Sequence, residues 1–127
     1  MKRCLICIGS NYNRKKNLLL ARQRLQALFP TVRFATEEET EPLYLRSFAL
    51  FSNQVAEFVT ELDEECVVDE LKAIEREAGR RPGDKVKEQI CLDIDLLMYD
   101  GKILRPKDMK QEYVRKGLKE LDYLDLK

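Results

Sequence analysis

The sequence has 127 residues, of which 44% are hydrophobic and 36% charged, a composition that predicts one globular domain over residues 1–127 with a single core. Lys plus Arg total 23, and Asp plus Glu also total 23, so no excess positive charge indicates a nucleic-acid partner. Histidine is absent, which excludes Ser-His and Cys-His catalysis and leaves carboxylate, thiolate or amide groups to bind a metal. We expect a monomer or a weak homodimer.

The first apolar run, residues 3–8, predicts a buried strand. Cys4 and Cys7 within it have the spacing of a redox motif or half of a zinc site. Side chains alternate along a strand, so these two should lie on opposite faces, which favours ordinary buried cysteines in a reducing cytoplasm. Because no apolar run reaches the ~18–20 residues that span a membrane, we expect a cytoplasmic protein without a membrane partner.

A helix is predicted over residues 14–29, where apolar side chains recur at helical spacing. Asn11 and Asn13 precede it and are candidate caps. Residues 32–36 alternate in the manner of a second strand, and an acidic turn is expected over residues 37–41.

The second half of the chain shows four further patterns. A long strand is predicted within residues 44–61, and a helix with an apolar stripe follows over residues 64–78. Residues 80–88 are polar and contain a Pro-Gly turn, which predicts a surface loop. Residues 90–99 alternate as a strand, and a short helix is expected around residues 113–121.

The order of these elements predicts the fold class. Strand, helix, two strands, helix and strand give an α+β, ferredoxin-like β-α-β-β-α-β sandwich with a short C-terminal extension. Alternation along the long strand puts Phe51, Asn53 and Val55 on one face and Ala56 on the other.

Asp93 and Asp95 carry the clearest chemical signal. Carboxylates two residues apart share one face of a strand, and like charges so placed repel each other unless a cation lies between them. Magnesium is the natural cation, because it prefers carboxylate oxygens and completes its shell with water and phosphate. The alternative reading of the same motif is a solvated strand edge with two ordinary acids.

Short motifs occur in a fixed order along the chain: Ile8-Gly9-Ser10-Asn11, Thr40-x-Pro42-Leu43, Phe51-Ser52-Asn53, Glu75 with Gly79-Arg80, and Leu92-Asp93-Ile94-Asp95. In order and spacing, from Ile6 to about Gly101, they resemble the 6-hydroxymethyl-7,8-dihydropterin pyrophosphokinase family. This resemblance implies a cytoplasmic enzyme of folate biosynthesis that transfers pyrophosphate from ATP to a pterin with the help of Mg²⁺.

The resemblance also implies roles for individual residues. Asp93 and Asp95 would hold the metal and, with Arg80, form the catalytic group. The nucleotide would contact Glu75, Arg80, Lys85 and Lys87. The pterin would contact Thr40, Leu43, Phe51 and Asn53.

Two regions depart from the family pattern. Members carry Trp and Arg in the loop before the aspartates, where this chain has Lys85 to Ile90, and a C-terminal Phe that this chain lacks. Tyr113 and Arg115 are candidate substitutes near the C-terminus. Two alternatives to the kinase therefore stay open: a divergent relative that binds nucleotide or pterin or acts on another acceptor, and an interaction domain whose acids are merely solvated.

Overall fold

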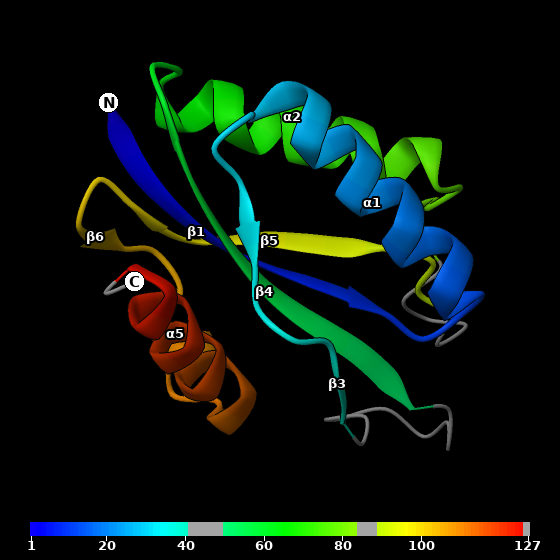
Figure 1. The fold of residues 1–127 in the computed structure, drawn as a ribbon. Helices are drawn as coiled ribbons and strands as arrows, with labels where there is room; N and C mark the ends of the chain where they lie inside the picture. Colours follow the sequence, from blue (N-terminus) through cyan, green and yellow to red (C-terminus); the bar gives the residue numbers. More distant parts are fainter. Residues whose placement is uncertain (41–49, 84–88, 126–127) are drawn as a thin grey trace.

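The computed structural model describes residues 1–40, 50–83 and 89–125, without the side chains of 123–125 (Figure 1). The strands are β1 Lys2–Ser10, β2 Arg33–Phe34, β3 Glu38–Thr40, β4 Phe51–Thr60, β5 Asp93–Tyr99 and β6 Lys102–Ile103. The helices are α1 Arg14–Leu28, α2 Glu64–Glu77, α4 Pro106–Met109 and α5 Glu112–Asp125. An α+β protein was predicted, and this class is confirmed: the structure has an antiparallel sheet and helices.

The strands form one antiparallel sheet in the order β2-β4-β1-β5-β6, and β3 also pairs with β4. β1 is central, which suits a strand that is buried on both faces. Its register places Gly9 opposite Asn53 of β4 and opposite Asp93 of β5. Cys7 in the same way lies opposite Asp95. Asn53 of β4 and the two aspartates of β5 are thus placed on either side of β1.

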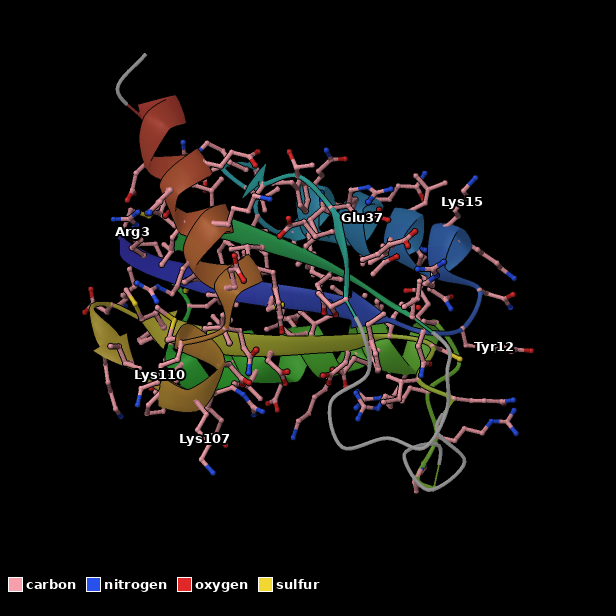
Figure 2. All side chains as sticks on the ribbon, turned by 90° about the horizontal axis from the view of Figure 1, so that it is seen from below. Arg3, Tyr12, Lys15, Glu37, Lys107 and Lys110 are labelled. Atoms are coloured by element: carbon pink, nitrogen blue, oxygen red, sulfur yellow. The ribbon has the colours of Figure 1, made fainter. Side chains whose placement is uncertain are left out.

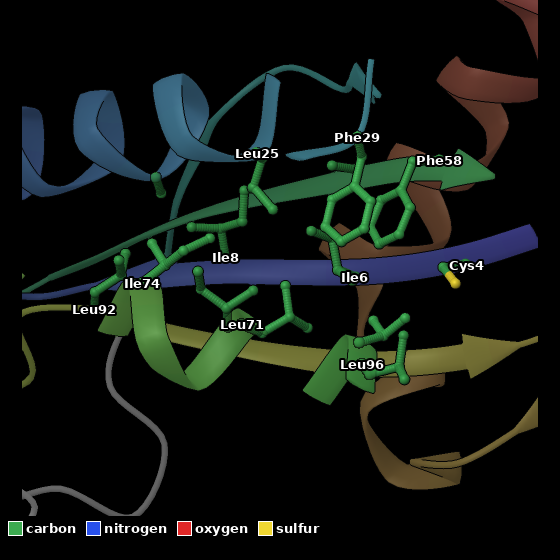
Figure 3. Close-up of a cluster of buried hydrophobic side chains, with 14 of the residues drawn as sticks. Cys4, Ile6, Ile8, Leu25, Phe29, Phe58, Leu71, Ile74, Leu92 and Leu96 are labelled. Atoms are coloured by element: carbon green, nitrogen blue, oxygen red, sulfur yellow. The ribbon is translucent and has the colours of Figure 1, made fainter. Parts of the chain in front are cut away.

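Helices α1 and α2 cover one face of the sheet, and α5 crosses the other face (Figure 1). The core under α1 and α2 contains Phe29 and Phe58, whose rings stack with centroids 3.9 Å apart (Figure 3). The core under α5 includes Val55. Gly117 lets α5 approach β4 closely, because a Cβ there would lie 2.8 Å from the Val55 side chain.

The expectation for the two N-terminal cysteines is confirmed. Cys4 and Cys7 are free and buried in different cores, on opposite faces of β1. Asp63 caps α2 by accepting a 2.8 Å hydrogen bond from the backbone N–H of Cys66. Gly79 ends this helix region with a φ of 103°, a conformation that favours glycine.

Other expectations need correction. An acidic turn was predicted over residues 37–41, but Glu38–Thr40 form the strand β3. The polar side chains of this strand border a pocket and not a core, so the sequence shows no apolar alternation there. Asn13 holds the N-cap position of α1 without a side-chain cap bond. The Asn11 side chain accepts a 2.6 Å hydrogen bond from the Ile90 N–H and so fastens the chain before β5.

The C-terminal extension is larger than predicted. The expected short helix over 113–121 runs from Glu112 to Asp125 and crosses the sheet face opposite α1 and α2. Among the residues that the structure describes, no helix is long and apolar enough to cross a membrane.

Candidate active site

Asp93 and Asp95 alternate on β5 with the buried residues Ile94 and Leu96. Burial of the aliphatic side chains in the α1/α2 core turns both carboxylates to the opposite face. There they border a pocket of about 880 Å³ between the sheet and the C-terminal helices. The predicted placement of both carboxylates on one face is confirmed.

Three of the residues predicted to contact a pterin line the same pocket: Thr40, Phe51 and Asn53. The Asn53 side-chain amide donates a hydrogen bond of 2.5 Å to the Thr40 hydroxyl. Asn53 is buried and extends over Gly9, where a Cβ would lie 3.2 Å from its Oδ1. The bare backbone of Gly9 therefore makes room for the amide between β4 and β5.

The electrostatics of the aspartate pair suit a bound cation. Burial, then the charge of Asp93 and a hydrogen bond with it, raise the pKa of Asp95 to about 7. The Asp95 side chain is only 28% exposed, so its negative charge is poorly solvated without a nearby positive charge. A divalent metal ion would accept the two carboxylates as oxygen ligands and would neutralise their negative charge. The residues present therefore fit such an ion.

Within the described residues, no group of three or more Asp, Glu or Cys side chains is arranged to hold a metal. A cation at Asp93 and Asp95 would therefore complete its shell mainly with water and substrate oxygens. Magnesium commonly binds in this way, through one or two carboxylates and phosphate.

Arg80 contacts the aspartates from the α2 side. Its Nη1 donates to Asp93 Oδ1 at 2.7 Å and to the Leu92 carbonyl at 3.2 Å, and lies 3.4 Å from Glu75 Oε2. Glu75 accepts a 2.7 Å hydrogen bond from the Ile94 N–H. Burial, the largest effect, raises the pKa of Glu75, while this bond and Arg80 oppose the shift. Glu75 and Arg80 thus contact β5 from the α2 side of the sheet.

Glu75 and Arg80 do not border the main pocket. They line a smaller hollow of about 310 Å³ together with the cationic residues Lys72, Arg76 and Arg81. Leu43, Lys85 and Lys87, the remaining predicted site residues, lie outside the described part of the chain.

Most of the pocket wall formed by the C-terminal helices was not predicted from the sequence. In the described part of the chain this wall consists of Arg105, Lys107, Asp108, Gln111, Glu112, Tyr113 and Lys116. Of these, only Tyr113 was considered as a site residue; burial, the largest effect, raises the pKa of its hydroxyl and of the Cys7 thiol beside it. Arg115, the other candidate, is exposed and does not line the pocket. The apolar spacing of Val114 and Leu121 was the available signal, because it shows which face of α5 packs inward.

Comparison with known proteins agrees with this geometry. The family model described as 7,8-dihydro-6-hydroxymethylpterin-pyrophosphokinase matches residues 5–123. The folic acid synthesis protein fol1 of Pneumocystis carinii is 29% identical in an alignment 127 residues long, gaps included, that covers 91% of this chain and 17% of that protein. The chain therefore spans less than a fifth of that relative's length. Because the family match extends over nearly all of its residues, the chain belongs to the 7,8-dihydro-6-hydroxymethylpterin-pyrophosphokinase family.

Proposed function

We propose that this chain transfers pyrophosphate from ATP to 6-hydroxymethyl-7,8-dihydropterin in folate biosynthesis, in a reaction that depends on Mg²⁺. The observation that carries the proposal is one pocket shared by Asp93 and Asp95 with Thr40, Phe51 and Asn53. Family membership supports the same reaction class. The strand order β5-β1-β4-β2 also supports a ferredoxin-like core, to which β3, β6, α4 and α5 are added.

The acceptor ring would bind at Asn53 and Phe51. One N–H of the Asn53 amide is engaged by Thr40, which leaves its carbonyl oxygen and second N–H for the polar edge of a heterocycle. Phe51 lines the pocket beside it and offers an aromatic face. Tyr113, on the α5 wall, offers a second aromatic ring in the same pocket.

Asp93 and Asp95 would hold Mg²⁺ between the acceptor and the nucleotide. The metal would neutralise negative charge on the phosphates as the reaction proceeds. Asp95 must lose its proton to serve as a ligand, and its pKa of about 7 allows this at neutral pH. Arg80 fixes the Asp93 carboxylate from behind through the 2.7 Å hydrogen bond.

The nucleotide would approach over the α2 side. Glu75 and Arg80 are the residues proposed to contact it, and the surrounding cations of the small hollow favour phosphate groups. Lys85 and Lys87 are proposed as further phosphate contacts.

The reaction itself needs positioning more than covalent chemistry. The acceptor hydroxymethyl oxygen bonds to the β-phosphorus, its proton passes to water, and the bond to the oxygen bridging the α-phosphate breaks to release AMP. In-line alignment of the two substrates and neutralised charge lower the barrier to such a transfer. No histidine is required for either task.

The direct test is AMP release from ATP. We expect release that requires both 6-hydroxymethyl-7,8-dihydropterin and Mg²⁺ and that falls by at least about 100-fold in Asp93→Asn, since this change removes a metal ligand. AMP release that is absent, or that is unaffected by leaving out the acceptor, would refute the proposed transfer.

One observation favours a second candidate, a relative that acts on another acceptor or only binds a ligand. Among the described residues, four acids besides the aspartate pair line the main pocket: Glu38, Glu39, Asp108 and Glu112. This acidic wall suits a ligand with cationic or strongly hydrogen-bond-donating groups. Nucleotide binding without pterin binding would favour this candidate over the pyrophosphokinase.

A further inference from the structure

Arg105 reaches the aspartate pair from the side opposite to α2. It directly precedes α4, lines the main pocket, and places Nη1 3.7 Å from Asp95 Oδ1. Arg80 holds Asp93 from the α2 side. The two carboxylates are therefore flanked by two guanidinium groups, of which only Arg105 borders the pocket.

The backbone around Arg105 is fixed on both sides. The Leu104 N–H donates to the Leu97 carbonyl at 2.8 Å, and the Leu104 side chain packs against the α1/α2 core. Met109 packs against the core under α5, and its N–H donates to the Arg105 carbonyl at 3.1 Å. The position of Arg105 beside β5 is therefore set by anchors in both cores.

The guanidinium is anchored at one end only. Its Nε donates to Asp108 Oδ2, whereas the 3.7 Å separation from Asp95 is an ion pair too long to be a hydrogen bond. In the described part of the chain, neither terminal nitrogen of Arg105 donates a hydrogen bond. The side chain is 51% exposed, so its N–H donors remain available to a ligand that enters the pocket.

The other cations of the pocket are placed less well for phosphate. Lys116 donates to Glu38 at 2.7 Å, on the β3 side of the pocket. Lys107 lines the pocket but forms no ion pair with either aspartate within the described residues. Of the described cations that line this acid-rich pocket, only Arg105 forms an ion pair with Asp95, so a polyphosphate entering beside a metal ion would meet it there.

We propose that Arg105 is a phosphate-binding residue that contacts the metal-bound nucleotide from the α4 side, a role that rests on the proposed function. A divalent ion at Asp93 and Asp95 repels the guanidinium and weakens its ion pair with Asp95. The bond to Asp108 keeps Nε in place, and the terminal nitrogens then donate to oxygens of the phosphate chain. A planar guanidinium binds two such oxygens at once, which a lysine ammonium does not.

The test measures binding by calorimetry, with Mg²⁺ alone and with Mg²⁺ plus a nonhydrolysable ATP analogue. We expect Arg105→Ala to raise the dissociation constant of the analogue by about 10- to 100-fold, the usual effect of losing hydrogen bonds to a charged group. Arg105→Lys restores only part of this loss. Affinity for Mg²⁺ alone stays equal or improves, because a positive charge near Asp95 is removed.

Lys110→Ala is the matched control, since Lys110 directly follows the same helix, is exposed, and does not line the pocket (Figure 2). It removes one positive charge and should change analogue affinity by less than about twofold. Equal affinities in Arg105→Ala and Lys110→Ala overturn the role of Arg105. Parallel loss of Mg²⁺ and analogue binding in Arg105→Ala also overturns it, because that result indicates a damaged metal site. If the wild-type protein binds Mg²⁺ but does not bind the nucleotide analogue, the proposed function is refuted as well.

Discussion

Gly9 of β1 lies opposite Asn53 of β4, and a Cβ at position 9 would stand 3.2 Å from the Asn53 Oδ1. The predicted ring-binding amide thus depends on a neighbouring residue without a side chain. We expect Gly9→Ala to shift the amide by a few tenths of an ångström and to weaken pterin binding about tenfold or more. Affinity for Mg²⁺ and the ATP analogue serves as the internal control and should change little. Pterin affinity equal to that of the wild type would show that Asn53 does not read the ring.

The pKa of Asp95 predicts how metal binding depends on pH. Protons and Mg²⁺ compete for this carboxylate, whose pKa is raised to about 7 by burial and by Asp93. Between pH 8 and pH 6 the deprotonated fraction falls about tenfold, so affinity for Mg²⁺ should fall by a similar factor. Calorimetric titration with Mg²⁺ across this range measures it. Constant affinity would exclude Asp95 as a ligand that must first lose a proton.

The same carboxylate predicts a change in stability without metal. The folded-state pKa of Asp95 is raised above the ordinary value of 3.8, so the folded state binds the extra proton and loses stability as the pH rises from about 4 through 7. In the presence of a chelator, Asp95→Asn should raise the free energy of unfolding at pH 8 on the order of 1–3 kcal/mol and change it little at pH 5.

Urea unfolding at both pH values, in the presence of the chelator, checks this prediction. A destabilised Asp95→Asn variant at pH 8 would mean that the carboxylate is satisfied by protein groups and does not need a cation.

Gly117 predicts a structural effect at the pocket wall. A Cβ at this position would lie 2.8 Å from the Val55 side chain, which is fixed in the middle of β4. Gly117→Ala should therefore push α5 away from the sheet and lower the free energy of unfolding by roughly 1–3 kcal/mol. Lys119→Ala, at an exposed position of the same helix, is the control and should change it by less than about 0.5 kcal/mol. Equal unfolding midpoints for the two variants would show that α5 can shift without a loss in the free energy of unfolding.

The elements that bury an apolar stripe or run were predictable from the sequence. Residues 3–8 and the alternation around Ile94 identify β1 and β5, because each buries its aliphatic side chains. The pocket wall was harder to predict. Glu38 and Glu39 form a strand whose side chains face a pocket, so no apolar pattern marks it.

The contacts of Arg80 and Arg105 were also not predictable from the sequence. Arg80 was assigned to the catalytic group with the aspartates and to the nucleotide, but its 2.7 Å hydrogen bond to Asp93, thirteen positions later in the chain, was not predicted. Arg105 was not considered, because its place beside Asp95 depends on where Leu104 and Met109 are buried. Such tertiary placement does not follow from local periodicity.

The measurement that tests the central claim most directly is calorimetric titration with a nonhydrolysable ATP analogue and Mg²⁺, with and without 6-hydroxymethylpterin, in wild-type and Asp95→Asn protein. We expect the wild type to bind both ligands, and Asp95→Asn to lose Mg²⁺-dependent nucleotide binding while its fold persists. Unchanged nucleotide binding in Asp95→Asn, or binding that does not require Mg²⁺, would contradict the assignment of Asp93 and Asp95 as the metal site.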